Sequence, residues 1–126
     1  PSVRWGTVHL FNNYFSSTGN NYCVRTRLNA QTRIEHNVFA GVRNPWEVYI
    51  TDPTNAVWRV FATNNLERNT TWGTTTTNKN GRQIVLMVPG TNTVFTPPYA
   101  YTPDPPDQVP SLISNYCGAG VILFKP

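Results

Sequence analysis

Three short stretches of the chain alternate apolar and polar residues and then close on asparagine: residues 8–13 (VHLFNN), 34–37 (IEHN) and 60–65 (VFATNN). Alternation with a period of two predicts strands that bury one face, and asparagine is typical of the bend that ends a strand. No window keeps apolar residues at the spacing of an amphipathic helix, so we predict no long helix. The pattern indicates an all-β chain of short strands.

The closing asparagines Asn13, Asn37 and Asn65 recur at intervals of 24 and 28 residues. A period of this size indicates stacked repeats. It leaves too little chain for a strand–helix–strand unit, but it suits one coil of a parallel β-helix, whose strands pair with those of the next coil. We predict that the three asparagines stack into a ladder, because their amides both donate and accept hydrogen bonds and asparagine tolerates the left-handed backbone of a corner. Three independent asparagine turns are the alternative.

Residues 1–67 are assigned to these coils, and the aromatic residues that follow the bends, Tyr14, Phe15 and Phe39, are expected to stack. Residues 68–126 lack the repeat and are expected to wrap along the same coils as part of one domain.

Within that wrap, residues 70–80 are polar and of low complexity, which predicts a loop, and residues 83–88 (QIVLMV) predict a buried strand or an irregular packing element. The proline-rich residues 103–110 exclude regular structure in the interior. Three large side chains are expected to anchor the wrap: Tyr99, Tyr101 and Leu112.

The two cysteines, Cys23 and Cys117, have no spacing that suits a zinc site. A disulfide between them would staple the wrap to the first coils and contribute about 4–5 kcal/mol in the chain-entropy model. Two unconnected thiols are the alternative.

The composition adds a basic, weakly charged surface: the net charge is +4, only 13% of residues are charged, and eight of the ten cations are arginine. The planar guanidinium fork matches carboxylate and phosphate groups. The partner is therefore expected to be an acidic polysaccharide or a nucleic acid. The alternative is a solvated basic surface that binds no partner. No apolar run is long enough to cross a membrane.

Residues 1–15 (PSVRWGTVHLFNNYF) resemble the P-x-x-R-x-G-x-V-H-x-x-N-N-Y-[YF] segment of pectate lyases, and residues 27–39 (RLNAQTRIEHNVF) resemble the next coil of that family. Residues 98–101 (PYAY) and 118–121 (GAGV) resemble its C-terminal wrap. The resemblance implies a right-handed parallel β-helix and a secreted enzyme that cleaves polygalacturonate, an acid of the plant cell wall, by calcium-dependent β-elimination. It makes nucleic acid and membrane unexpected partners.

Carried over residue by residue, the resemblance makes Arg4 a supporting catalytic residue that pairs with a uronate carboxylate. It makes Arg27 a second carboxylate-binding residue, with Arg25 as a rival because Thr26 should point to the opposite face from both. The family's proposed base, an arginine two positions before Pro1, and its Ca²⁺ ligands would lie in coils outside this sequence, so no metal ligand is assigned here. We therefore expect an N-terminal chain or segment of the same enzyme as partner, and no activity from this chain alone.

Two rival functions use the same fold. A pectin lyase acts on uncharged, esterified pectin without calcium and needs fewer arginines that pair with carboxylates. A β-helix that binds acidic polysaccharide without cleaving it would need no base. His9 is expected on the outer face, stacking or hydrogen bonding rather than acting as a base, and His36 is expected at the corner beside Asn37.

Overall fold

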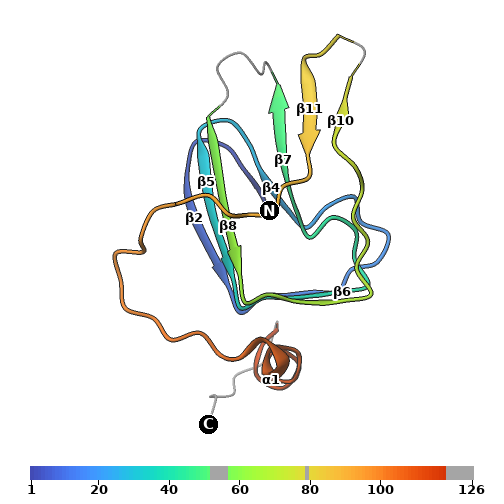
Figure 1. Ribbon diagram of the computed structural model, residues 1–126. Helices are drawn as coiled ribbons and strands as arrows, with labels where there is room; N and C mark the ends of the chain where they lie inside the picture. Colours follow the sequence, from blue (N-terminus) through green and yellow to red (C-terminus); the bar gives the residue numbers. More distant parts are fainter. Residues whose placement is uncertain (52–56, 79, 119–126) are drawn as a thin grey trace.

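The computed structural model describes residues 1–51, 57–78 and 80–118, whose strands form three sheets (Figure 1). Sheet A contains, in spatial order, β1 (Ser2–Val3), β4 (Val24–Thr26), β7 (Trp46–Thr51), β11 (Gln83–Leu86) and β10 (Thr76–Thr77). Sheet B contains β2 (Gly6–Phe11), β5 (Ala30–Glu35) and β8 (Trp58–Thr63). Sheet C contains β3 (Tyr14–Phe15), β6 (Val38–Ala40) and β9 (Leu66–Arg68).

The chain winds in coils, and each coil gives one strand to each sheet. In sheet B, Val8 lies opposite Thr32, which lies opposite Val60, all in parallel register. Sheets A and C pair the first coils in the same way, through β1 with β4 and β7 and through β3 with β6 and β9. Figure 1 shows the strands of successive coils side by side. The protein is a parallel β-helix, as the repeat predicted.

The core lies inside the coils because strand alternation sends every second side chain inward. Val24, Ile34, Val48 and Val60 are fully buried there. Thr26 also points inward, where its hydroxyl lies 2.7 Å from that of Thr32. The inward direction of Thr26 fixes the outward direction of its neighbours on β4.

The predicted asparagine ladder is confirmed. The amide nitrogen of Asn13 donates to the amide oxygen of Asn37 (2.9 Å), and that of Asn37 donates to the amide oxygen of Asn65 (3.1 Å). The backbone N–H of Asn37 also donates to Asn65 (3.0 Å), and its side chain donates to the carbonyl of Leu10 (3.0 Å). Asn37 is completely buried, so its amide satisfies backbone groups that the bend takes out of the sheets.

One detail of the corner differs from the prediction. The left-handed backbone belongs to the residue before each ladder asparagine: Asn12, His36 and Asn64 have φ of 56°, 55° and 53°. Two of these are asparagine, the residue type that tolerates this conformation best after glycine. The bend and the ladder are therefore carried by different residues.

The predicted aromatic stack forms between Phe15 and Phe39, whose ring centroids are 4.9 Å apart with nearly parallel planes. Tyr14 lies in register with Val38 and does not extend that pair. In the third coil Glu67 occupies the position opposite Phe39, so the stack stops there.

The end of the coil stack after the third coil is covered by later parts of the chain. β11 pairs antiparallel with β7, as the predicted strand at residues 83–88 allows, and β10, within the predicted loop, pairs with β11. Along β8, Ala62 donates its N–H to the carbonyl of Gly90 (2.8 Å). A side chain at Gly90 would place its Cβ 2.7 Å from that of Ala62, so this close cover requires glycine.

The other end of the stack is different. β1, β2 and β3 are terminal strands of their sheets, so each keeps one edge without a strand partner among residues 1–51, 57–78 and 80–118. Unpaired edges present a row of backbone donors and acceptors that can accept a further strand.

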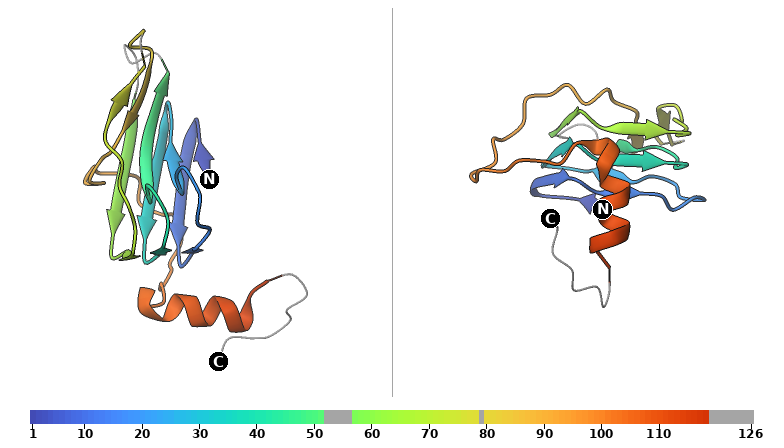
Figure 2. Two further views of the ribbon diagram at one scale, coloured as in Figure 1. Left: turned by 90° about the vertical axis from the view of Figure 1, so that its right-hand side faces the viewer. Right: turned by 90° about the horizontal axis from the view of Figure 1, so that it is seen from below.

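The wrap crosses the outer face of sheet B and then forms a 3-10 turn (Pro106–Gln108) and helix α1 (Val109–Tyr116). The prediction excluded regular structure for residues 103–110 only from the interior, and these two elements lie at the surface, with Val109 their one buried residue. Pro110 lies in the first turn of α1, where proline costs no hydrogen bond because the first N–H groups of a helix have no partner within it. Figure 2 shows α1 running across the coils at one end of the strands.

The predicted disulfide is not formed. Cys23 is a buried free thiol in the core beside Val24, and Cys117 is an exposed free thiol just after α1. Burial raises the pKa of Cys23 to about 11. The wrap is held by hydrogen bonds and packing instead. Residues 119–121 of the GAGV segment lie outside the described residues.

Replacing Asn37 with alanine should lower the free energy of unfolding by about 2–4 kcal/mol, because several buried donors and acceptors lose their partner together. Urea unfolding followed by circular dichroism measures the change. Asn115→Ala, at an exposed position of α1, is the matched control and should change stability by less than about 0.5 kcal/mol. Equal effects of the two substitutions would contradict a stabilising ladder.

Candidate functional site

The outer face of sheet A carries a cluster of arginine and tyrosine side chains. Arg25 on β4 lies opposite Glu47 on β7, and both point outward because their neighbours Val24, Thr26 and Val48 are buried in the core. The next outward position on β7 is Tyr49. Parallel register therefore collects these side chains on one surface that runs across the coils.

Arg25 is held by an ion pair and two rings. Its Nε and Nη2 atoms each lie 2.6 Å from Oε1 of Glu47. Its guanidinium lies 3.9 Å from the centroid of the Tyr22 ring and 4.6 Å from that of Tyr49. The Glu47 side chain is only 2% exposed. A buried carboxylate needs such a partner, and stacking on aromatic rings fixes the guanidinium further.

Arg27 lies on the same face, with its guanidinium 5.1 Å from the centroid of the Tyr49 ring. Its backbone N–H donates to the carbonyl of Val3 (2.8 Å), which brings it beside Arg4 of the first coil. Arg4 is exposed. Over the described ranges of the chain, neither Arg4 nor Arg27 has an acidic partner. The charges of these two arginines are thus available to a ligand, whereas Glu47 neutralises the charge of Arg25.

A pocket of ≈ 240 Å³ adjoins Arg25 and Glu47. Its walls include Arg43 and Asn44 from the loop between β6 and β7, and Thr76 and Val85 from the hairpin β10–β11. The hairpin therefore extends sheet A and bounds the surface on one side. Of the two guanidinium groups that line it, that of Arg25 is neutralised by Glu47, so Arg43 supplies the positive charge that an anionic ligand would meet.

The structure brings together the predicted residues Arg25 and Arg27 around Tyr49, and places Arg4 one coil away in the adjacent register position. Three further residues of this face, Glu47, Tyr22 and Tyr49, were not predicted from the sequence. The signal that could have revealed Glu47 was its position 22 residues after Arg25, since the first two ladder asparagines are separated by a similar interval.

A second polar cluster lies on the outer face of sheet B, beneath the wrap. Nε2 of His9 donates to Oε1 of Glu35 (2.6 Å), and Nδ1 of His9 lies 2.7 Å from the hydroxyl of Tyr99. The hydroxyl of Tyr101 donates a short hydrogen bond to Glu35, and Nε of Arg33 lies 3.3 Å from the same oxygen. The prediction that His9 points outward and forms hydrogen bonds is confirmed.

This second cluster clamps the wrap to the coils rather than facing a ligand. The side chains of His9 and Glu35 are 3% and 7% exposed, so solvent and substrate reach them poorly. Burial alone would raise the pKa of the Glu35 carboxyl. The hydrogen bonds from Tyr101 and His9, with the positive charge of Arg33, outweigh burial and hold that pKa below its usual range. The hydrogen bond between Tyr101 and Glu35 also raises the pKa of the Tyr101 hydroxyl.

His36 lies at the corner beside the ladder, as predicted, with its ring 3.5 Å from the amide of Asn64. Its Nδ1 atom is buried and has no hydrogen-bond partner in the described part of the chain. Nothing about it indicates catalysis.

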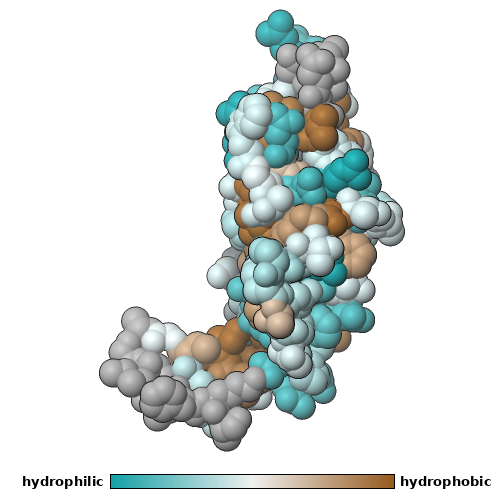
Figure 3. Space-filling model, turned by 90° about the vertical axis from the view of Figure 1, so that its left-hand side faces the viewer, coloured by the Kyte–Doolittle hydropathy of each residue, from teal (hydrophilic) through white to brown (hydrophobic). Residues whose placement is uncertain are grey.

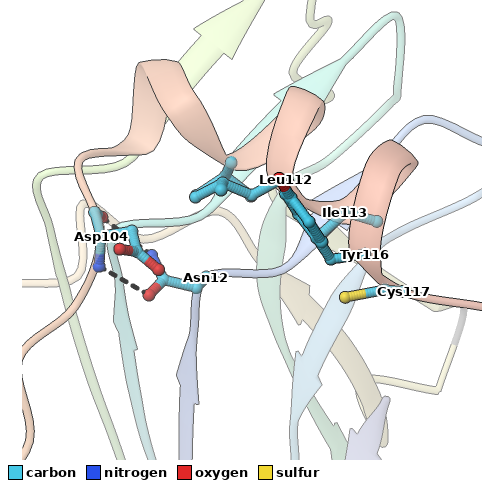
Figure 4. A pocket seen from close by; sticks show the side chains of 7 residues that line it. Asn12, Asp104, Leu112, Ile113, Tyr116 and Cys117 are labelled. Carbon is cyan, nitrogen blue, oxygen red and sulfur yellow. Dashed lines mark hydrogen bonds between the residues drawn. The ribbon is translucent and has the colours of Figure 1, made fainter. Parts of the chain in front are cut away.

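An apolar pocket of ≈ 240 Å³ lies between α1 and the corner at Asn12 (Figure 4). Leu112, Ile113 and Tyr116 line it from the helix. Asn12 exchanges hydrogen bonds with the backbone of Asp104 at its edge (2.8 and 2.9 Å). Figure 3 shows hydrophobic residues gathered near α1 on a side where hydrophilic and hydrophobic residues otherwise mix. This pocket lies away from the arginine face.

The described residues contain no group of three or more histidine, cysteine, aspartate or glutamate side chains that could hold a metal ion. Ca²⁺ takes six to eight oxygen ligands, with carboxylates prominent among them, and the carboxylates of Glu35 and Glu47 are already engaged. This part of the chain therefore does not fit a calcium site. None of its helices is long and apolar enough to span a membrane.

With this geometry in view, comparison with known proteins assigns the family. Residues 1–122 match the pectate lyase family, and the chain belongs to it. The chain is 31% identical over 125 residues to a pectate trisaccharide-lyase of Bacillus licheniformis, covering 97% of this chain and 31% of the relative. It is 42% identical over 59 residues to a probable pectate lyase A of Aspergillus flavus, covering 47% of this chain and 17% of the relative.

Solved structures agree with the sequence relatives. A doubly substituted pectate lyase from Xanthomonas campestris superimposes with a TM-score of 0.71 at 27% identity, covering 95% of this chain and 36% of that one. A singly substituted form of the same enzyme gives a TM-score of 0.69. The chain thus spans about a third of the length of the enzymes that it matches over most of its residues.

Glu47→Gln should lower the free energy of unfolding by about 1–3 kcal/mol, because Arg25 loses its counter-charge while remaining partly buried. Urea unfolding at neutral pH measures the loss. Asp107→Asn, at an exposed position in the 3-10 turn, is the control and should be nearly neutral. No difference between the two variants would mean that the ion pair does not order the arginine face.

The clamp predicts a specific pH dependence. Because the folded state lowers the pKa of Glu35, its contribution to stability is complete above the ordinary glutamate pKa of about 4.3 and is lost as pH falls through the folded value. Unfolding free energies measured across this acid range should fall less steeply for Glu35→Gln than for the unsubstituted chain. Parallel curves for the two proteins would show that Glu35 does not link protonation to the clamp. Asp107→Asn again serves as the control for a general acid effect.

Proposed function

We propose that this chain supplies the C-terminal coils and part of the substrate cleft of a secreted pectate lyase, which cleaves polygalacturonate by calcium-dependent β-elimination. The observation that carries the proposal is the outer face of sheet A. There Arg4 and Arg27 directly follow the neighbouring strands β1 and β4, and neither has an acidic partner in the described chain. Neighbouring strands lie about 4.8 Å apart, so the two guanidinium groups form a row across the coils that suits a polymer of carboxylates.

In this proposal each arginine has its own task. Arg4 pairs with the carboxylate of the uronate that loses its proton, and this positive charge stabilises the enolate-like charge that develops next to the carboxylate. Arg27 binds the carboxylate of another sugar on the adjacent coil. Arg25 is already neutralised by Glu47, so it is assigned to holding Tyr49 and shaping the surface rather than to binding a carboxylate directly.

The reaction needs groups beyond the described residues. The base that removes the proton and the carboxylates that hold Ca²⁺ are assigned to coils that stack on the unpaired edges of β1, β2 and β3. Bound calcium would add positive charge near the substrate carboxylates and make the neighbouring proton more acidic. The chain by itself is then expected to bind substrate weakly and to be inactive.

Two other functions fit less well. A pectin lyase binds esterified, uncharged sugars and has little use for a row of arginines without counter-charges. A β-helix that only binds acidic polysaccharide would use the same arginines. Only the formation of unsaturated product distinguishes a lyase from such a binding protein.

The test is the ultraviolet absorbance of the unsaturated product when the complete enzyme acts on polygalacturonate with and without calcium. Arg4→Ala should lower kcat/KM by about 10²–10³-fold through kcat, as expected for a group that stabilises charge in the transition state. Arg27→Ala should mainly raise KM, and Arg27→Lys should restore part of the affinity. If the complete enzyme forms unsaturated ends only on esterified pectin, or forms none, the pectate lyase assignment is wrong.

A further inference from the structure

Trp5 combines two unfavourable features at the corner between β1 and β2. Its side chain is 65% exposed, although burial of a tryptophan is strongly favourable. Its backbone adopts the left-handed conformation, with φ of 59°, which a bulky residue rarely does. The corner is fixed by hydrogen bonds from the N–H groups of Trp5 and Gly6 to the carbonyls of Leu28 and Asn29 (both 3.1 Å).

The next coil shows which residue this corner ordinarily favours. β2 and β5 pair in register from Gly6 and Ala30 onward, so Asn29 occupies the same corner position as Trp5. Asn29 has nearly the same backbone conformation, with φ of 56°, and asparagine tolerates it well. Within the described residues, Trp5 therefore adopts a strained conformation without gaining burial in return. Strain and an exposed apolar surface together are typical of a functional position.

The position of Trp5 indicates the kind of ligand. It directly follows Arg4, whose charge has no acidic partner among the described residues. One face of a pyranose ring carries C–H bonds and is apolar, and such faces stack on indole rings, while a uronate also bears a carboxylate. An exposed tryptophan next to a guanidinium thus matches both parts of a uronate sugar.

We propose that Trp5 forms a stacking subsite for one pyranose ring of an acidic polysaccharide, beside the carboxylate-binding Arg4. The inference rests on the proposed function, and it adds a binding residue that recognises the sugar ring rather than its charge. The stacked sugar lies at the border between sheets A and B, at the first-coil end of the arginine row. Its contribution should depend little on ionic strength, whereas that of Arg4 should weaken with salt.

The key variant is Trp5→Asn, which places at this corner the residue found in the next coil. In the complete enzyme it should raise Tm by relieving backbone strain and weaken the binding of an oligogalacturonate by about tenfold, measured by isothermal titration calorimetry. Trp5→Phe keeps an aromatic ring and should keep most of the affinity. Val57→Ala is the matched control, because Val57 is an equally exposed apolar residue at the same corner two coils on.

The outcomes separate the inference from the proposed function. If Trp5→Asn binds oligogalacturonate as tightly as the unsubstituted protein, while Arg4→Ala and Arg27→Ala bind more weakly, the stacking subsite is refuted and the arginine row stands. If Trp5→Asn lowers Tm and leaves affinity unchanged, Trp5 has a packing role and the inference is also wrong. If the unsubstituted protein does not bind oligogalacturonate at all, both the inference and the proposed function fail.

Discussion

The register between coils is the constraint on which the structure depends, and the asparagine ladder is the interaction that maintains it. In a parallel stack, a slip of one residue would turn every inward side chain outward. Asn37 opposes such a slip because its amide bonds to the coil on either side and to the backbone carbonyl of Leu10. Parallel strands need this support, since they carry no tight hairpin that would set their alignment.

The arginine face follows from the same register. Arg25 meets Glu47, and Arg27 comes beside Arg4, only because β1, β4 and β7 align as they do. The face is therefore built from single residues contributed by successive coils, each held in place by the buried residues next to it in the strand. The hydrogen-bonded clamp of Glu35 and Tyr101 secures the wrap on a different face, which leaves the outer surface of sheet A open to a polymer.

Much of the fold could be predicted from the sequence because its determinants are local. The alternation before each asparagine and the interval between asparagines are visible in the sequence. Together they predict the β-helix, because the interval matches the length of one coil. The pairing of Arg25 with Glu47 could not be predicted with the same ease, because the loops between strands vary in length and shift the alignment of sheet A relative to the ladder. The sequence pattern does not reveal helix α1, because prolines weigh against a helix in general, although Pro110 occupies a position where a helix accepts it. The sequence leaves a disulfide and two separate thiols both open, and the separate locations of the cysteines, in the core and after α1, follow only from the path of the wrap.

The most direct test of the account is a crystal structure of the complete enzyme with a bound oligogalacturonate. The sugar chain should cross the coils on the outer face of sheet A, with carboxylate oxygens within hydrogen-bond distance of the guanidinium groups of Arg4 and Arg27. Density for the sugar on sheet B, on sheet C or in the pocket beneath α1, with Arg4 and Arg27 left in solvent, would contradict it.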